Sequence, residues 1–130
     1  SYDLSAIATA AYCNYPLFRE LTSTHDMYLP PTSTHQAYKL HNINRLLDIY
    51  PAAIGSKSGF TDNAGPCLVS MATRNGHHLA AVVLNAQRMF DQSRALLEWG
   101  FTQEGLPALY PSPVPTPPAP PLAAPRRPRR

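Results

Sequence analysis

The 130-residue sequence has few of the residues that mark disulfide-rich, zinc-binding or membrane-spanning proteins. Its two cysteines, Cys13 and Cys67, are too few for a disulfide framework or for a zinc site built from paired CxxC motifs. Cys13 lies in a helical pattern and Cys67 in a strand pattern, so both are predicted to be buried as small apolar residues. No apolar run approaches the ~18–20 residues of a membrane span, and no signal peptide is recognisable.

Charged residues are also scarce, at 15% of the chain, and they are unevenly placed. Nine of the fifteen prolines follow Tyr110, together with four of the eleven basic residues, all of them arginines. Without residues 111–130 the chain has seven basic and eight acidic residues, a net charge of about −1. The net charge of +3 therefore belongs to the C-terminal end, and nucleic acid is not an expected partner.

This composition predicts two regions. Residues 106–130 are expected to form a disordered tail rich in proline and arginine, extended and solvated, because they have too few apolar side chains for a core. Residues 1–105 are expected to fold. Pro125–Arg130 also fits a PxxPxR ligand pattern, but such matches arise from composition alone in a tail of this kind.

Helical periodicity is clearest near the two ends of the folded region. Residues 2–14 place Leu4, Ile7, Ala8, Ala11 and Tyr12 on one face, with Ser1 as the N-cap. Residues 88–98 place Met89, Phe90, Ser93, Leu96 and Leu97 on one side, and Gly100 is predicted to end that helix. A short helical turn is predicted over 44–50. Residues 18–40 are predicted to form extended segments and turns.

Three strands are predicted between these helices, over 54–60, 67–73 and 79–84. The last two are separated by Arg74-Asn75-Gly76-His77. Asn-Gly is a strong signal for a two-residue hairpin, because both positions of a type I′ turn need a positive φ.

The first of these strands contains Lys57-Ser58-Gly59, which is the most informative motif in the sequence. It matches the K-T-G box of penicillin-binding proteins and serine β-lactamases, with serine in place of threonine. The hydroxyl is kept and only a methyl group is lost. Alone, a three-residue match is weak, and a lysine on an edge strand is ordinarily a solvated charge.

The surrounding residues make the match specific. His41-Asn42-Ile43-Asn44-Arg45-Leu46-Leu47 lies upstream of the box, Thr61-Asp62-Asn63-Ala64-Gly65 follows it, and the last helix ends in Leu96-Leu97-Glu98-Trp99-Gly100-Phe101. In order and spacing, residues 1–103 resemble the C-terminal part of the catalytic domain of the low-molecular-mass serine D-Ala-D-Ala carboxypeptidases, peptidase family S11. The resemblance implies an α+β penicillin-binding, β-lactamase-like transpeptidase fold that is only partly present: the edge strand with the K-[ST]-G box, the hairpin and the terminal helix.

The resemblance also implies roles for four consecutive residues. Lys57 would be catalytic, supplying positive charge and organising proton transfer near a nucleophilic serine. Ser58 and Gly59 would bind substrate: the hydroxyl would hold the terminal carboxylate of a D-Ala-D-Ala stem peptide or of a β-lactam, and the missing Cβ would let the substrate lie close. The backbone N–H of Phe60 would be an oxyanion donor.

Two boxes of the family are missing. No Ser-x-x-Lys occurs, because the residues three places before Lys39 and Lys57 are Gln36 and Ile54. Ser-x-Asn is also missing. Tyr12-Cys13-Asn14 imitates its Tyr-x-Asn variant, but in the family that box precedes this helix, so we treat the match as accidental. None of the residues of this chain is therefore the nucleophile, and the chain is predicted to be inactive alone.

The remaining expectations follow from the family. The activity would be removal of the terminal D-Ala from peptidoglycan stem peptides through an acyl-serine, and no cofactor is expected. The enzyme would act in the cell envelope, on the outer side of the cytoplasmic membrane and close to it. Five histidines invite a metal hypothesis, but His77-His78 flanks a turn and His25, His35 and His41 lie in irregular polar segments, so no metal is expected. Two other functions stay open: a non-catalytic module that binds D-Ala-peptides or penicillin, and binding of anionic polymers through the basic tail.

Overall fold

The computed structural model describes residues 1–110, which form an α+β arrangement of four helices and five strands within that range. In chain order the elements are α1 (Tyr2–Asn14), α2 (Pro16–Ser23), β1 (Asp26–Leu29), β2 (Tyr38–His41), α3 (Leu46–Ile49), β3 (Ala53–Thr61), β4 (Gly65–Arg74), β5 (His77–Val83) and α4 (Met89–Gln103). The predicted α+β class is confirmed, and the part of the chain after residue 110 lies outside the described residues.

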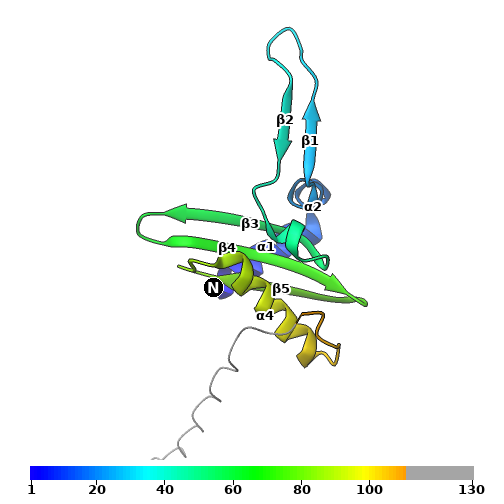
Figure 1. Cartoon of the computed structure of the whole chain (residues 1–130), viewed down its shortest axis with the longest axis vertical. Helices are drawn as coiled ribbons and strands as arrows, with labels where there is room; N and C mark the ends of the chain where they lie inside the picture. Colours follow the sequence, from blue (N-terminus) through cyan, green and yellow to red (C-terminus); the bar gives the residue numbers. More distant parts are fainter. Residues whose placement is uncertain (111–130) are drawn as a thin grey trace, which may run out of the picture.

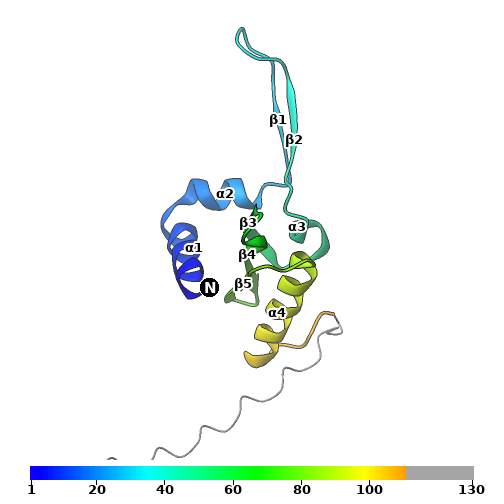
Figure 2. The same ribbon diagram turned by 90° about the vertical axis from the view of Figure 1, so that its left-hand side faces the viewer.

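A three-stranded antiparallel sheet, ordered β3-β4-β5, forms the centre of the fold. Helices α1 and α2 lie against one face of this sheet, and α3 and α4 lie against the other (Figure 2). The short strands β1 and β2 form a separate hairpin that stands away from the body (Figure 1). The sheet thus has covered faces, and within the described residues β3 and β5 are its two outer strands.

The predicted strands and their turn are confirmed, each strand being slightly longer or shifted at its ends. The turn between β4 and β5 has φ angles of 49° at Asn75 and 82° at Gly76, as a type I′ hairpin requires. The register that follows pairs Arg74 with His77 and Leu68 with Val83. The short helix predicted near 44–50 is present as α3.

The main core lies between the sheet and the helices α3 and α4. One cluster of buried residues consists of Leu46, Tyr50, Ala52, Ala72, Ala81, Leu97 and Phe101, and a second consists of Leu68, Val83 and Ala86. Burial of large side chains such as Leu97 and Phe101 stabilises the fold by roughly 1.5–3 kcal/mol each. This core holds β3 and β4 in place.

Helix α4 does not end at Gly100, so that prediction is wrong. It continues to Gln103 and ends in a Schellman motif, in which Gly105 takes a φ of 81° and the N–H of Leu106 donates to the carbonyl of Phe101 at 3.0 Å. Gly100 has another reason to be small: a Cβ there would lie 2.8 Å from Leu79 Cδ1 on β5. In the longer helix, Ser93, Leu97 and Phe101 lie on the buried face. Leu96 was predicted to lie on that face, but it is 43% exposed.

The prediction for residues 18–40 is wrong at its start and incomplete elsewhere. Residues 16–23 form α2, with Pro16 in the first turn, where its missing N–H costs nothing. The extended segments pair as β1 and β2, from Asp26↔His41 to Leu29↔Tyr38. All eight of their residues are exposed. The apolar run of β1, Met27-Tyr28-Leu29, does not alternate, and β2 alternates over only four residues, so the pattern is too short to predict a paired hairpin.

Helix α1 is confirmed over the predicted residues, but its apolar face is largely uncovered. It has no buried residue, and Tyr2, Leu4 and Ile7 are 82%, 41% and 65% exposed. Ser1 occupies the N-cap position without a side-chain cap bond. The predicted burial of the cysteines is wrong for Cys13, which is exposed, whereas Cys67 is half-buried. A helix that touches the sheet along a narrow line leaves the adjoining positions in solvent.

A buried polar network fixes the end of α4 to the sheet. The Tyr50 hydroxyl donates to Glu98 Oε1 at 2.6 Å, and Arg74 Nη1 lies 3.0 Å from the same oxygen. The N–H of Leu109 donates to Glu98 Oε2 at 2.7 Å, and Arg74 Nη2 donates to the Pro107 carbonyl. Burial and the bond to Glu98 raise the pKa of Tyr50 far above its usual value. Residues 106–110 are thereby held against the domain. The domain boundary predicted at residue 105 stays a prediction.

Candidate functional site

The Lys57-Ser58-Gly59 motif lies in the middle of β3, an outer strand of the described sheet. Its partner on the inner side is β4, with Lys57 opposite Val69, Ser58 opposite Leu68, Gly59 opposite Cys67 and Phe60 opposite Pro66. Strand β4 is held by hydrogen bonds on both sides, so β3 is mounted on a rigid support. The motif is thereby presented along a sheet edge.

The register determines which backbone groups face outward. In an antiparallel strand the N–H and C=O of one residue point to the same side, and the side alternates along the chain. The Pro66 carbonyl accepts from the N–H of Ala86 at 2.8 Å, so Pro66 faces β5 and not β3. Its partner Phe60 therefore belongs to a non-hydrogen-bonded pair, and its N–H points away from the sheet.

The same alternation applies along the whole motif. The N–H of Thr73 donates to the carbonyl of Ala52 at 2.9 Å, which places the odd-numbered residues of β4 toward β3. Lys57 and Gly59, opposite Val69 and Cys67, therefore use their backbone groups within the sheet. Ser58 and Phe60 direct their N–H and C=O groups to the outer edge. An extended peptide laid along β3 would meet these groups as hydrogen-bond partners.

The side chains of the motif are accessible. Lys57 is exposed, its ammonium donates to the Ser58 carbonyl, and it makes no ion pair within residues 1–110. Ser58 is half-buried, and Phe60 is 68% exposed. A Cβ added at Gly59 would meet nothing within 4 Å, whereas one at Gly55 would lie 2.7 Å from Thr22 Oγ1. Packing thus explains why residue 55 is glycine, whereas no packing contact requires a glycine at position 59.

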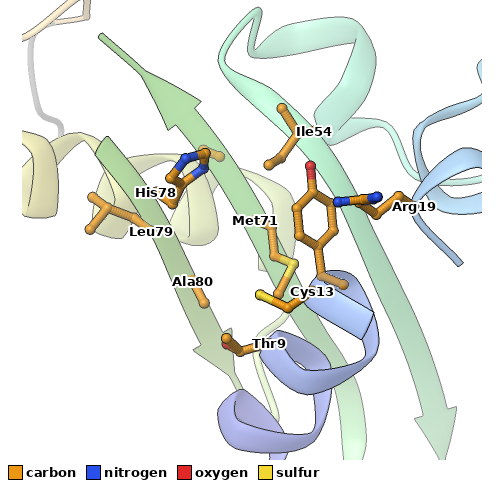
Figure 3. A pocket seen from close by; sticks show the side chains of 10 residues that line it. Thr9, Cys13, Arg19, Ile54, Met71, His78, Leu79 and Ala80 are labelled. Atoms are coloured by element: carbon orange, nitrogen blue, oxygen red, sulfur yellow. The ribbon is translucent and has the colours of Figure 1, made fainter. Parts of the chain in front are cut away.

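The Tyr12-Cys13-Asn14 segment does not join this motif. Asn14 Nδ2 donates to the Ala10 carbonyl of its own helix at 2.8 Å. Cys13 and Tyr12 line a cavity of about 370 Å³ between α1 and the sheet, together with Thr9, Arg19, Ile54, Met71, Ala72, His78, Leu79 and Ala80 (Figure 3). The walls of this cavity are mostly apolar. No pattern in the sequence indicates the cavity, because its residues are far apart along the chain.

Four of the five histidines pair with acidic or hydroxyl side chains, whereas His35 Nδ1 lies 2.8 Å from the Gln36 carbonyl oxygen. At the base of the hairpin His41 Nδ1 lies 2.8 Å from Asp26 Oδ1, and His25 Nδ1 lies 3.3 Å from Asp48 Oδ1. The hydrogen bond to Asp26 raises the pKa of His41, with smaller contributions from the charges of Asp26 and Asp48. Sequence reasoning missed this pair because it missed the hairpin. Within residues 1–110 no group of three or more His, Cys, Asp or Glu side chains is placed to hold a metal ion.

No helix among the described residues is both long enough and apolar enough to cross a membrane.

Comparison with known proteins gives one consistent result. The profile of the D-alanyl-D-alanine carboxypeptidase family, peptidase S11, matches residues 1–88. D-alanyl-D-alanine carboxypeptidase DacB2 of Mycobacterium tuberculosis is 32% identical over 107 residues, which are 78% of this chain and 36% of that protein. A solved mutant of the Streptomyces K15 DD-transpeptidase has a TM-score of 0.70 at 31% identity, covering 77% of this chain and 41% of its own.

A further solved relative is penicillin-binding protein D2 from Listeria monocytogenes in its cefotaxime-bound form, with a TM-score of 0.65 at 31% identity, covering 76% of this chain and 39% of its own. These structures confirm the predicted penicillin-binding fold in partial form. The chain thus spans roughly two-fifths or less of the length of these relatives. With the K-S-G strand, its hairpin and its terminal helix in the family's order, the chain belongs to the D-alanyl-D-alanine carboxypeptidases of peptidase family S11.

Proposed function

We propose that this chain supplies the substrate-binding edge of a serine-type D-Ala-D-Ala carboxypeptidase site. The observation that carries the proposal is the register of β3, which turns the N–H groups of Ser58 and Phe60 outward beside an exposed lysine. A stem peptide would lie along this edge as an added strand. The compartment of such an enzyme would be the cell envelope, on the outer side of the cytoplasmic membrane.

Each residue of the edge has a proposed task. The Ser58 hydroxyl donates to the terminal carboxylate of the substrate, and the Lys57 ammonium adds positive charge beside it. Gly59 leaves room for the peptide backbone. The Phe60 N–H donates to the oxygen of the scissile carbonyl, where negative charge develops as the tetrahedral intermediate forms.

The covalent step needs a serine that this chain does not contain. That serine would attack the carbonyl of the penultimate D-Ala, giving an acyl-serine and releasing the terminal D-Ala as its amine. Water would then hydrolyse the ester and regenerate the serine. Because the chain has no Ser-x-x-Lys box, we expect it to bind substrate without turning it over.

Two measurements on the full chain test this proposal. Incubation with a fluorescent penicillin followed by intact-mass analysis is expected to give no stable acyl adduct, and a stoichiometric adduct on any serine would overturn the assignment of the nucleophile. Titration with an N-acylated D-Ala-D-Ala dipeptide is expected to shift the amide NMR signals of residues 57–60, whereas the L-Ala-L-Ala isomer leaves them unchanged.

The two lysines of the chain provide a matched pair for this titration. Lys57→Ala should weaken dipeptide binding at least tenfold, since Lys57 is the only cationic residue within the segment 57–60. Lys39→Ala, on β2, should leave it unchanged. Equal binding by the two variants would remove β3 from the proposed site.

The second candidate function is a non-catalytic binding module. The exposed edge of β3, in a chain that has no Ser-x-x-Lys box, favours this candidate. The relative penicillin-binding protein D2 has been solved with cefotaxime bound. We therefore propose β-lactams as ligands both for the binding module and for the enzyme. Reversible dipeptide binding by the chain, with no activity restored by any longer natural form, would support the module over the enzyme.

A further inference from the structure

The side chain of Phe60 has no role in the proposed function, which uses only the backbone N–H of this residue. Its ring is 68% exposed, and within residues 1–110 it is the only exposed large apolar side chain on the three-stranded sheet. Single apolar side chains are common on protein surfaces and by themselves indicate nothing. This ring, however, lies on the same strand as the Lys57-Ser58-Gly59 motif and directly follows it.

The register places the Phe60 ring on one particular face of β3. Successive side chains of a strand point to opposite faces, so Ser58 and Phe60 share a face and Lys57 points to the other. The pairs Ser58↔Leu68 and Phe60↔Pro66 belong to one stretch of unshifted register. Leu68 is part of a buried cluster on which the start of α4 packs, so the shared face is the one that α4 covers.

The proposed hydrogen bonds determine the direction in which a ligand lies along β3. Its terminal carboxylate is at Ser58, and its scissile carbonyl is at the N–H of Phe60, two residues or about 6.5 Å further along the strand. A peptide in this position is antiparallel to β3. Its penultimate residue lies opposite Phe60 at the strand spacing of about 4.8 Å, and its N-acyl group continues past Phe60 toward Thr61.

The D configuration of the ligand leaves the space beside the ring free. An L-residue opposite Phe60 would direct its side chain to the same face as the ring and form a cross-strand pair with it. In a D-residue on the same backbone path, the side chain and the hydrogen on Cα exchange positions, so the methyl group does not fill that space. The parts of the ligand nearest the ring are then the backbone of its penultimate residue and its N-acyl group.

We propose that the Phe60 ring is a specificity-determining contact for the N-acyl side of the ligand, and that it favours acyl groups with an aromatic end. This inference rests on the proposed function, because it needs a D-Ala-D-Ala ligand or a β-lactam along β3. An exposed ring gains from being covered, and two aromatic rings attract each other beyond the area they bury. Lys57 points to the opposite face, so its charge is kept apart from this apolar contact.

Two ligands that differ only in their acyl group test this contact on the full chain: N-acetyl-D-Ala-D-Ala and N-phenylacetyl-D-Ala-D-Ala. The dissociation constant of each is measured from the shifts of the amide NMR signals of residues 57–60. The phenylacetyl compound is expected to bind about fivefold more tightly. Phe60→Ala should bring this ratio close to one, and Phe60→Leu should retain part of it. Tyr28→Ala on β1, at a ring that is 58% exposed, is the matched control and should keep the ratio.

The outcomes separate the ring contact from the proposed function. If both ligands shift the signals and bind equally, the ring contact is wrong and the proposed function stands without it. A preference that persists in Phe60→Ala would also overturn the contact. If neither ligand shifts the signals, the proposed function fails and the contact fails with it. On the unsubstituted chain, nuclear Overhauser effects between the Phe60 ring and the phenyl group of the ligand are expected. Their absence at saturating ligand would overturn the contact, whatever the variants show.

Discussion

At the scale of single residues, electrostatic environment decides which charged side chains matter to the fold. Arg74 and Glu98 are paired at 3.0 Å with side chains only 11% and 3% exposed, and the Arg74 guanidinium also lies 4.7 Å from the centre of the Phe101 ring. Arg88 and Asp91 are paired at the same 3.0 Å, but Arg88 is 76% exposed. Equal distances therefore correspond to unequal energies.

Arg74→Ala is expected to destabilise the chain strongly, because it leaves the Glu98 carboxylate buried without its cation. A loss of about 3 kcal/mol in the free energy of unfolding is the expected size for a broken buried pair. Arg88→Ala, at the exposed pair, should cost less than about 1 kcal/mol. Urea unfolding of both variants measures the difference. Similar losses would show that the buried network contributes no more than a surface pair.

His41 gives the chain a pH dependence near neutrality. Its raised pKa means that the folded state binds the proton more tightly than the unfolded state, whose histidine titrates near 6.5. The stabilisation is therefore complete below about pH 6.5 and disappears as the pH rises through the raised pKa. An NMR titration of the His41 ring measures this pKa, and Asp26→Asn should bring it down. An unchanged value in that variant would contradict the hydrogen bond as the main cause.

At the scale of elements, the ends of helices and strands depend on a few backbone positions. Gly105 ends α4 in the left-handed region, with a φ of 81°, and a Cβ there would touch nothing within 4 Å. Gly100 is the reverse case, since it lies inside the helix and is limited by Leu79. A glycine near a helix end is thus a capping signal only where its φ is positive.

Gly105→Ala is expected to lower the free energy of unfolding by about 1–2 kcal/mol through the backbone alone, because no neighbour would clash with the new methyl group. Gly105→Asn should recover part of this loss, since asparagine tolerates the left-handed region. Thermal unfolding of the two variants tests the order. An alanine variant as stable as the natural chain would contradict the Schellman end of α4.

At the scale of the whole molecule, β5 is an outer strand of the described sheet and has an open edge. By the same alternation of backbone groups, His78, Ala80 and Val82 direct their N–H and C=O groups away from β4. The segment Leu79–Leu84 carries no charge. Beside it, α1 exposes Tyr2, Leu4 and Ile7. An edge of this kind readily pairs with another chain.

The full chain is therefore expected to self-associate through β5. Sedimentation velocity at ~100 μM should show species larger than a monomer. Ala80→Lys places a charge on the edge and should shift the distribution toward monomer, whereas Ala108→Lys, outside the strands, should not. A single monomeric species that unfolds cooperatively would indicate that the described residues form a self-sufficient fold.

Local sequence signals predicted much of the secondary structure and the position of the candidate site. The Asn75-Gly76 pair predicted its turn because only certain residues accept positive φ, and the periodicity of residues 2–14 predicted α1. The K-S-G motif was found because its residue types are rare in combination with their neighbours. The hairpin of β1 and β2 was missed because β1 does not alternate and β2 alternates over only four residues.

By itself, the sequence determined the family, the order of β3, β4, β5 and α4, and the absence of a nucleophile box, because these depend on residue identity and spacing along the chain. Only the tertiary structure decided which backbone groups face outward on β3 and why Gly100 must be small. These properties depend on register and on contacts between residues far apart in the chain, and burial and hydrogen bonding act only after those residues meet.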